Sequence, residues 1–430
     1  MTRSKVHDFN APSGWNAMLP PRRPNPPIAG THRVKYAVVG AGYTGAAAAR
    51  RLHELDPAGD IVLLDAGTVG EGSSGRNSGF TRPLEFPMEL TRANAGRVGK
   101  IKPYYEEGFY WLKDIVERHA IECGLVRAGV IRGAATDLGE SRIRTAGKVL
   151  DELGYEHQIL TREEMNERVA TRYYRCGLLV TDSYLLQPAA LIRGLVDSLP
   201  KAIQVHERSM VRKLSRSGTW RLELDGAAVE ADFVVLATNA YVKHFGYLVD
   251  RTVATYTYAG ITEAMTPEDA ARCGSMEHWG ILPPHKMGTT CRRVGQNRLM
   301  VRSLASYEGE LRPDVVKAGL TDIFRARWPH LAHVRLEHVW GGATAFTMNG
   351  APWWGKFDEG LYSAGGCNGA GITKGTLLGK RLAELMTGSG EHGGLVEAIG
   401  EPSWIAPEPF RRIGYHVIAR KERKMAGAER

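Results

Sequence analysis

Hydrophobic residues occur along this chain in short blocks, and the first clear block lies at residues 34–39. It reads VKYAVV and predicts a buried strand. A glycine turn and an alanine-rich stretch follow, which predict a helix through about His53. A second apolar block ends on Asp65 and predicts another buried strand. This order of elements is typical of a βαβ unit.

The glycine turn of this unit has the spacing of a dinucleotide-binding motif. Gly40 permits a tight turn, Gly42 lets backbone amides approach a pyrophosphate, and Gly45 lets the helix lie close to the sheet. The helix N-terminus favours the negative charge of the diphosphate. Asp65 is placed to accept a hydrogen bond from a ribose hydroxyl. The unit therefore predicts a dinucleotide site.

Two further glycine-rich loops are predicted to contact the same ligand. Residues 68–80 read TVGEGSSGRNSGF and combine unhindered amides with small donors, which favours a loop around a polar ligand over a flexible linker. Residues 360–386 predict a strand at Leu361–Ala364, a glycine loop and a helix at Ile372–Met386. One dinucleotide has room for both the βαβ turn and this distant loop.

The rest of the chain mixes helical and strand-like patterns. Amphipathic spacing predicts a helix at 104–122, and two more helices are expected at Arg142–Leu153 and Pro188–Ser198. A buried strand is predicted at 232–237, while 252–262 and 297–303 alternate apolar and polar positions. We expect an α/β fold, a Rossmann-like domain with an interleaved second domain of α+β character on a mixed or antiparallel sheet.

The length of 430 residues favours two intertwined domains over one core. Residues 1–33 are rich in proline and arginine and cannot supply a core, so we expect an extended segment that is laid over the surface or frayed from it and lies outside the fold. The expected division is a dinucleotide-binding domain at 34–90, 200–245 and 335–400, a substrate-binding domain at 91–199 and 246–334, and a basic C-terminal tail at 401–430.

Composition narrows the class of protein. No apolar run reaches the roughly 20 residues of a membrane helix, and the N-terminus lacks the apolar segment of a signal peptide, so we expect a cytoplasmic protein without a membrane span. The five cysteines are scattered without metal-ligand spacing, which predicts reduced thiols and no metal site.

The formal net charge is +9, and much of the excess lies at the C-terminus. Residues 411–430 hold seven basic side chains and two acidic ones. A solvated terminal helix is the simpler interpretation, and contact with RNA or another anionic surface is the alternative.

Five motifs together resemble the D-amino-acid-oxidase-like FAD oxidoreductases. They are GAGYTG at 40–45, GSSGRNSGF at 72–80, ATNAY at 237–241, WGG at 340–342 and GCNGAGITKGTLLGKRLAE from Gly366. The branch that contains gamma-glutamylputrescine oxidase is the most similar, and the resemblance extends over about residues 12–390.

The resemblance implies that the dinucleotide is FAD. It places the first glycines at the pyrophosphate, Val211 at the adenine, and the loop from Gly366 near the flavin edge, where its amides favour an anionic reduced flavin. The sequence has no histidine between Asp65 and Thr91, and the position of Cys367 matches a cysteine that non-covalent relatives also carry, so non-covalent FAD is expected. The implied cofactor residues are Gly40, Gly42, Tyr43, Thr44, Gly45, Asp65, Ala66, Ser73, Ser74, Gly75, Arg76, Asn77, Ser78, Gly79, Val211, Thr238, Asn239, Gly342, Gly366, Cys367, Asn368, Gly369, Gly371, Ile372, Thr373 and Lys374.

The chain departs from the family pattern at Arg302, where glycine is usual on the substrate side of the flavin. A guanidinium there suits a substrate carboxylate or phosphonate, and an exposed arginine at a strand end is the alternative. Arg302, Lys286 and Tyr258 are the candidate catalytic residues, Lys286 for its possible role in oxygen attack. The wider set of candidates for the substrate pocket is Tyr256, Tyr258, His285, Lys286, Arg292, Arg302 and Trp340.

The resemblance implies an oxidase or dehydrogenase that removes hydride from the carbon beside a neutral amine and passes it to flavin N5. The expected substrate is a small amine or amino acid, with an anionic group, and the electron acceptor is oxygen or a carrier. A tRNA-modifying flavoenzyme and a flavin-bearing subunit of a larger dehydrogenase are the alternatives, although nucleic acid is the less expected partner. The assembly state stays open.

Overall fold

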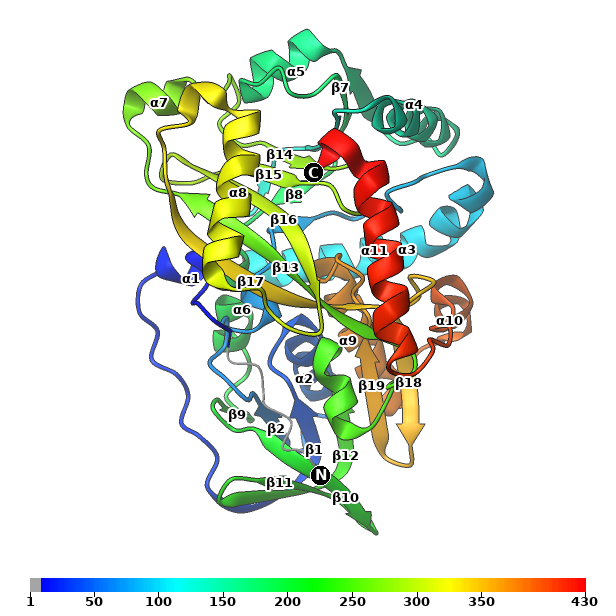
Figure 1. Cartoon of the computed structure of the whole chain (residues 1–430). Coiled ribbons are helices and arrows are strands. Elements are labelled where there is room, and N and C mark those ends of the chain that lie inside the picture. Colours follow the sequence, from blue (N-terminus) through cyan, green and yellow to red (C-terminus); the bar gives the residue numbers. More distant parts are fainter. Residues whose placement is uncertain (1–8) are drawn as a thin grey trace.

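The computed structural model describes residues 9–430 and arranges them around two eight-stranded sheets and a smaller three-stranded one (Figure 1). The first sheet lies in the lower half of Figure 1 and the second in the upper half. Chain segments cross between the two sheets several times, so neither sheet is built from one continuous stretch of sequence.

The first sheet has the parallel core of a dinucleotide-binding fold. Strand β1 pairs in parallel with β12 along its whole length and with β2 on its other side, and β19 extends the sheet beyond the C-terminal half of β12. An antiparallel meander covers the other half of β12. The strands are β1 (Gly30–Val39), β2 (Ile61–Leu64), β9 (Ile203–His206), β10 (Val211–Ser217), β11 (Thr219–Leu224), β12 (Ala227–Leu236), β18 (Trp353–Asp358) and β19 (Leu361–Gly365).

Helices α2 (Tyr43–Leu55) and α9 (Ile372–Met386) pack closely against each other beside this sheet. The close approach depends on glycine, because a Cβ at Gly379 would lie 2.1 Å from the Thr44 carbonyl oxygen. Both helices begin directly after glycine loops, so their N-termini point from the sheet edge toward the same region.

The second sheet is antiparallel except where β14 runs parallel to β5. Its strand order is β17-β13-β16-β15-β14-β5-β7-β6. Its strands are β5 (Val130–Ala134), β6 (His157–Leu160), β7 (Cys176–Val180), β13 (Val253–Thr262), β14 (Gly280–Leu282), β15 (Thr290–Val294), β16 (Arg298–Tyr307) and β17 (Leu336–Phe346), and the small sheet holds β3 (Phe80–Thr81), β4 (Val126–Arg127) and β8 (Tyr184–Leu185).

The predicted fold class, a Rossmann-like sheet with a second sheet of mixed and mainly antiparallel strands, is confirmed. The helix expected at 104–122 begins earlier, at Arg92, where Thr91 and Asn94 form a capping box. The helix expected at Arg142–Leu153 begins at Asp137, with Thr136 as its N-cap. The remaining helices are α1 (Gly14–Ala17), α3 (Arg92–Arg118), α4 (Asp137–Glu152), α5 (Arg162–Val169), α6 (Pro188–Asp197), α7 (Pro267–Ala271), α8 (Pro313–Arg327), α10 (Gly393–Ile399) and α11 (Phe410–Ala426).

The expectation that residues 1–33 lie outside the fold is wrong for part of the described segment. Residues 1–8 lie outside the described residues, but Gly14–Ala17 form α1 and Trp15 is fully buried against Trp340. Ile28 is buried as well. Proline-rich composition kept the segment extended between α1 and β1, yet the single tryptophan gave it enough apolar surface to dock.

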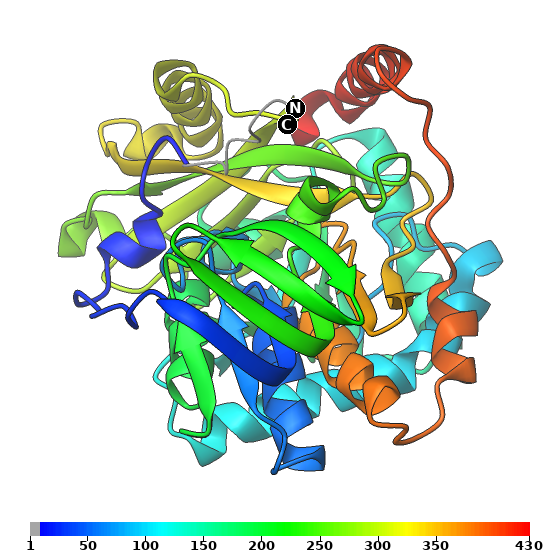
Figure 2. The same ribbon diagram turned by 90° about the horizontal axis from the view of Figure 1, so that it is seen from below.

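The C-terminal tail is also packed against the molecule. After α10 the chain runs along the outside to α11, which lies beside the second sheet (Figure 2). Near the end of the tail, the buried carboxylate of Glu429 accepts hydrogen bonds from the amides of Ala135 and Thr136, both 3.0 Å long, at the start of α4. The tail is therefore part of the fold rather than only a solvated helix.

Within residues 9–430, no helix is both long and apolar enough to cross a lipid bilayer. The same residues contain no group of three or more histidine, cysteine, aspartate or glutamate side chains arranged to hold a metal ion.

Candidate cofactor and substrate site

One large cavity of about 1830 Å³ lies where the two sheets face each other. It begins at the carboxyl ends of β1 and β2, passes the loop before α9 and reaches the face of the second sheet. A pocket for one ligand usually measures about 300–1000 Å³, so this cavity has room for a dinucleotide and a further small molecule.

Glycines shape the first end of the cavity. Gly40 has a φ of +103°, which a glycine adopts without strain, and a Cβ there would lie 2.7 Å from the Ala237 carbonyl oxygen. A Cβ at Gly45 would lie 1.8 Å from the Gly40 carbonyl oxygen, so this glycine permits the helix to lie on the turn. A Cβ at Gly42 would lie 2.7 Å from Ser74 Oγ, on the surface that faces the cavity.

Asp65 follows β2 and lines the cavity beside this turn. Its carboxylate accepts hydrogen bonds from the amides of Ala41 at 2.8 Å and Gly67 at 2.9 Å. Burial raises the pKa of Asp65, and these two amides act in the opposite direction. Each carboxylate oxygen can accept a further bond, which is what a ribose hydroxyl requires.

Two hydroxyl groups in the cavity wall test whether a dinucleotide fits. Thr238 Oγ1 and Ser78 Oγ are both buried, and neither has a hydrogen-bond partner among the described residues. Buried hydroxyls are normally satisfied, so these two fit a bound group that carries oxygen or nitrogen atoms along its length. The pyrophosphate and ribityl chain of FAD carry such atoms.

The loop Ser73–Gly79 is fixed from behind by groups of other elements. Trp15 donates from its indole nitrogen to the Asn77 carbonyl at 2.7 Å, and Arg292 donates to the Ser78 carbonyl at 2.9 Å. The guanidinium of Arg76 donates to the carbonyl oxygens of Ala11 and Gly341. Arg76 lines the cavity, and its guanidinium holds the loop against β17 through the bond to Gly341.

The loop before α9 closes the cavity at the boundary of the two sheets. Asn239 accepts from the Gly366 amide at 3.1 Å and donates to Cys367 Sγ at 3.3 Å, which links the end of β12 to this loop. Lys374 donates to the Cys367 carbonyl at 2.9 Å, and burial lowers the pKa of its ammonium group. Thr373 turns away and pairs with Thr81 at 2.8 Å.

Most of the implied cofactor residues line this cavity. Those in its wall are Gly40, Gly42, Tyr43, Thr44, Asp65, Ala66, Ser73, Ser74, Arg76, Asn77, Ser78, Val211, Thr238, Asn239, Gly342, Cys367, Asn368, Gly369, Gly371, Ile372 and Lys374. Gly45, Gly75, Gly79, Gly366 and Thr373 lie outside the wall. The last group supports the loops from behind; for example, a Cβ at Gly75 would lie 1.9 Å from the Gly70 carbonyl oxygen.

On the second sheet, strand alternation decides which side chains face the cavity. Thr255 and Thr257 of β13 line it, whereas Tyr256 and Tyr258 lie on the opposite face within the apolar core. The Tyr258 hydroxyl is 2.6 Å from Ser306 Oγ and accepts from the Leu311 amide, also at 2.6 Å. The expectation that Tyr258 acts in catalysis is therefore corrected, because its ring lies outside the cavity wall.

A β-bulge in β16 sits directly across from these threonines. Thr257 pairs with Ala305 and Tyr258 with Ser303, so Leu304 is the extra residue, with a φ of +59°. Arg302 and Ala305 both line the cavity, although they are three residues apart. Leu304 instead contacts the apolar core on the other face, and the bulge keeps this large side chain out of the cavity.

Arg302 is the most unusual group in the cavity wall. Its guanidinium donates to Thr257 Oγ1 at 2.6 Å, and no carboxylate lies within ion-pair distance of it among residues 9–430. Burial lowers its pKa, and the nearby Cys367 acts in the opposite direction. An arginine stays protonated in proteins, so a positive charge without a counter-ion lies near the loop before α9.

The other substrate-pocket candidates divide clearly. Lys286 lines the cavity and is exposed to solvent. Tyr256, His285, Arg292 and Trp340 lie outside the wall. Arg292 holds the loop described above, and Trp340 donates to the Arg76 carbonyl at 3.1 Å, so both stabilise the cofactor end from behind.

Sequence reasoning missed the C-terminal segment as part of the cavity wall. Trp404, Phe410, Tyr415, Ile418 and Glu422 all line it. The sequence does contain a signal for docking, because apolar residues recur at helical spacing within the basic tail. The positive charge of the tail, however, suggested a solvated helix. Glu85 and Met88, in the loop after β3, were missed too.

Comparisons with known proteins agree with this geometry. The family model of the FAD-dependent oxidoreductases named DAO matches residues 35–385. The gamma-glutamylputrescine oxidoreductase of Escherichia coli (strain K12) is 26% identical over 363 residues, which cover 82% of this chain and 84% of the relative. A probable oxidoreductase OrdL of Rhizobium meliloti (strain 1021) is 24% identical over 408 residues, which cover 93% and 94%.

Solved structures share the fold. Glycine oxidase from Geobacillus kaustophilus superposes with a TM-score of 0.70 at 20% identity, covering 84% of this chain and 96% of that one. L-proline dehydrogenase from P. horikoshii gives a TM-score of 0.67 at 15% identity, covering 85% and 96%. The family match spans most of the chain and includes the glycine turn and the loop before α9. The chain therefore belongs to the DAO family of FAD-dependent oxidoreductases.

Proposed function

We propose that this enzyme oxidises the C–N bond of an amine or amino acid that carries an anionic group, and forms the imine. The observation that carries the proposal is the Arg302 guanidinium, which lines the cavity, is partly buried and has no carboxylate partner among the described residues. A partly desolvated charge without a partner is costly, so the site is built for a ligand that brings the opposite charge.

The chain's own groups can bind and orient such a substrate. Arg302 offers several N–H donors in one plane, which suits a carboxylate or phosphonate, and Thr257 fixes one edge of the guanidinium. When bound, FAD would supply the hydride acceptor. The amides of the loop before α9 and the N-terminus of this helix favour negative charge at the cavity boundary.

The names of relatives support C–N chemistry. The Escherichia coli relative is named for an amine substrate, and the two solved structures are named for the oxidation of glycine and of L-proline. None of them is similar enough to fix the substrate of this chain, so the anionic group is inferred from Arg302 alone.

The proposed reaction is tested by mixing the anaerobic enzyme with a panel of amines, amino acids and aminophosphonates and following flavin absorbance. Loss of absorbance with acid-bearing amines, and little loss with the matching neutral amides, is the expected result. Equal bleaching by acids and amides would contradict the role of the anionic group.

An arginine pair on one strand supplies the matched variants. Arg302→Ala should raise the KM of an acid-bearing substrate by one to two orders of magnitude, because a charged hydrogen bond contributes about 1.5–3 kcal/mol. The KM of Arg302→Lys should lie between the KM of wild type and that of Arg302→Ala. Arg298 lies on the same strand outside the cavity, where it pairs with Glu337, so Arg298→Ala should leave KM unchanged. Equal effects at both positions would contradict the proposal.

We also propose that FAD is held without a covalent bond. Cys367, the cysteine in the cavity wall, is already contacted by the Asn239 amide at 3.3 Å, which keeps its sulfur at the end of β12. Acid denaturation should release all the flavin into the supernatant. Yellow colour that stays with the precipitated protein would contradict non-covalent binding.

Oxygen or an electron carrier is proposed as the final acceptor, with Lys286 as the candidate group for reaction with oxygen. Peroxide production in air, compared between wild type and Lys286→Met, separates the two acceptors. An oxidase that depends on Lys286 loses peroxide production in the variant, whereas its anaerobic bleaching is kept.

A further inference from the structure

The C-terminal strap, defined here as residues 404–430, forms one wall of the cavity. Arg411, Tyr415, Ile418 and Glu422 of α11 all line it. Their spacing of four, three and four residues places them on one face of a helix. Ile413 and Val417 lie on other faces of the same helix and outside the cavity wall.

This wall is held in place along its length. The Ile405 amide donates to the Asp250 carbonyl at 2.7 Å, Tyr307 donates to Glu408, and Arg423 donates to the Ala305 carbonyl at 3.3 Å. The Glu429 carboxylate, buried at the start of α4, fixes the far end. A segment attached at so many points is a stable part of the binding site.

The mouth of the cavity is apolar and open to solvent. Met348 is 66% exposed, Trp404 56%, Phe410 66% and Ile418 50%, and all four line the cavity. Large apolar side chains that line a cavity and reach solvent are costly in water unless they contact a ligand.

The apolar mouth is continuous with the Arg302 end of the cavity. Ala305 follows Arg302 by three residues on β16, lines the same cavity and accepts the hydrogen bond from Arg423 of α11. Because Leu304 is the extra residue of the bulge, Arg302 and Ala305 are only two register positions apart, so the strap meets the strand about 7 Å from the Arg302 backbone. A substrate whose anionic end pairs with Arg302 can extend toward α11.

We propose that the strap supplies an apolar subsite, formed by Met348, Trp404, Phe410 and Ile418, which binds an aliphatic or aromatic distal end of the substrate. The enzyme then prefers long or aromatic substrates over small amino acids such as glycine. This inference rests on the proposed function for the identity of the anionic end, but the apolar subsite has its own test.

The test measures binding to the FAD-loaded enzyme, by calorimetry and by perturbation of the flavin absorption spectrum. The probes are acetate, butanoate, hexanoate and octanoate, with ethanol, butanol, hexanol and octanol as the matching neutral series. Once the chain reaches the mouth, each added methylene should tighten binding about fourfold, since a buried methylene contributes about 0.8 kcal/mol.

Two isoleucines of α11 provide a matched pair of variants. Ile418 is 50% exposed and lines the cavity, and Ile413 is 57% exposed and does not. Ile418→Ala should weaken octanoate binding about tenfold and leave acetate binding unchanged, in line with the apolar area removed. Ile413→Ala should change neither. Trp404→Ala should likewise weaken octanoate binding and leave acetate binding unchanged.

Each outcome separates the two proposals. Affinity that is independent of chain length in both probe series, or equal effects of Ile413→Ala and Ile418→Ala, overturns the apolar subsite. If the alcohols show the chain-length dependence and Ile418→Ala abolishes it, the subsite stands. In that case, carboxylates that bind no better than alcohols overturn the anionic site at Arg302 alone.

Discussion

Single glycines decide whether the cofactor end of the cavity can form. The three glycines of the first turn have different neighbours: Gly40 meets a backbone carbonyl, Gly45 meets the turn itself and Gly42 meets a side chain beside the cavity. Only the third can be replaced without first breaking the βαβ unit, because the nearest atom is the hydroxyl of Ser74. It is therefore the position where binding can be tested separately from folding.

Gly42→Val should abolish flavin retention while the chain still folds. The new side chain starts 2.7 Å from Ser74 Oγ and extends into the cavity wall, where it blocks the approach of a pyrophosphate to the amides. The ratio of flavin to protein absorbance measures the effect, and circular dichroism checks the fold. Gly96→Ala, at a helical position with open space around it, is the control. Normal flavin content in Gly42→Val would contradict the assignment.

Substitution of Tyr258 should instead lower stability and leave the kinetics unchanged, since its role is structural. Tyr258→Phe leaves the part-buried Leu311 amide without its acceptor, which should cost about 1 kcal/mol, the lower end of the range for an unsatisfied donor. The melting temperature should fall, while kcat and KM of the proposed oxidation stay unchanged. A change in kcat with unchanged stability would return Tyr258 to the list of catalytic residues.

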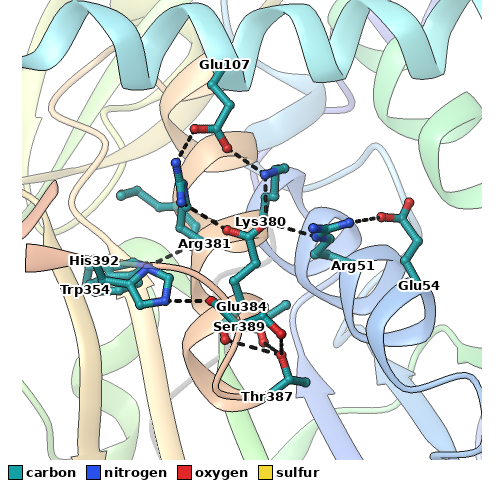
Figure 3. A network of polar contacts seen from close by, with 12 residues as sticks. Arg51, Glu54, Glu107, Trp354, Lys380, Arg381, Glu384, Thr387, Ser389 and His392 are labelled. Carbon is teal, nitrogen blue, oxygen red and sulfur yellow. Dashed lines mark hydrogen bonds and ion pairs between the residues drawn. The ribbon is translucent and has the colours of Figure 1, made fainter. Parts of the chain in front are cut away.

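At the scale of elements, a network of charges fixes helix α9 behind the loop that closes the cavity (Figure 3). Glu384 of α9 accepts from Lys380 at 2.7 Å and from Arg51 of α2 at 3.0 Å. Glu107 of α3 accepts from Lys380 at 2.6 Å and also contacts Arg381. The network therefore joins the three helices α2, α3 and α9. Of these, only α2 belongs to the first βαβ unit, where it follows the glycine turn.

Glu384 should make the protein sensitive to acid. Burial raises the pKa of Glu384, but the hydrogen bond and charge of Lys380, with the charges of Arg381 and Arg51, outweigh burial and lower it. A carboxylate with a lowered pKa stabilises the fold above its unfolded value near 4.5, and this contribution is lost as the pH falls through the folded value.

Glu384→Gln should thus destabilise the fold by about 3 kcal/mol at pH 7, as expected when one partner of a buried ion pair is removed. The difference in melting temperature from wild type should shrink as the pH is lowered toward 4. Glu397→Gln, which removes an exposed partner of Lys100, should have no measurable effect and is the control. A melting-temperature difference that grows as the pH falls would contradict the lowered pKa of Glu384.

At the scale of the whole molecule, both ends of the described chain connect the two sheets. Trp15 packs against Trp340 of the second sheet and donates to Asn77 in the loop Ser73–Gly79, which lines the cavity. The C-terminal strap reaches from Asp250, just before β13, to the start of α4. The cavity between the sheets is therefore bounded by segments that composition alone describes as tails.

Trp15→Ala should weaken both the fold and flavin binding, because Trp15 connects the second sheet to the loop Ser73–Gly79. Removing a fully buried tryptophan costs about 3–5 kcal/mol, and the Asn77 carbonyl also loses its donor. Flavin should dissociate more easily than from wild type, measured as the dissociation constant of FAD. Trp354→Ala offers a comparison, since Trp354 lies outside the cavity wall, donates to the Leu378 carbonyl of α9 and packs beside His392, so its loss should affect stability more than flavin affinity. Equal flavin affinity in wild type and Trp15→Ala would contradict the role of α1.

Local patterns predicted the parts of the fold that local physics controls. Helix α9 has the bounds expected from its sequence, Ile372–Met386, because a glycine loop starts it and its apolar face is continuous. The first βαβ unit follows for the same reason. The face of β13 could not be predicted, since tyrosine and threonine alternate there and a shift of one residue exchanges the two faces. The docking of α11 depends on contacts far along the chain, which no local pattern contains.

The alternation of β13 has a practical consequence for protein engineering. Val253, Thr255 and Thr257 line the cavity, whereas Tyr256 and Tyr258 lie in the core between them. A combinatorial library confined to these three odd-numbered positions varies the shape of the cavity on an unchanged scaffold, whereas Ala259 and Ile261 further along the strand belong to the core. A library at the even-numbered positions mainly yields unfolded proteins. Selection for new substrates should therefore accumulate its accepted changes at every second residue between Val253 and Thr257.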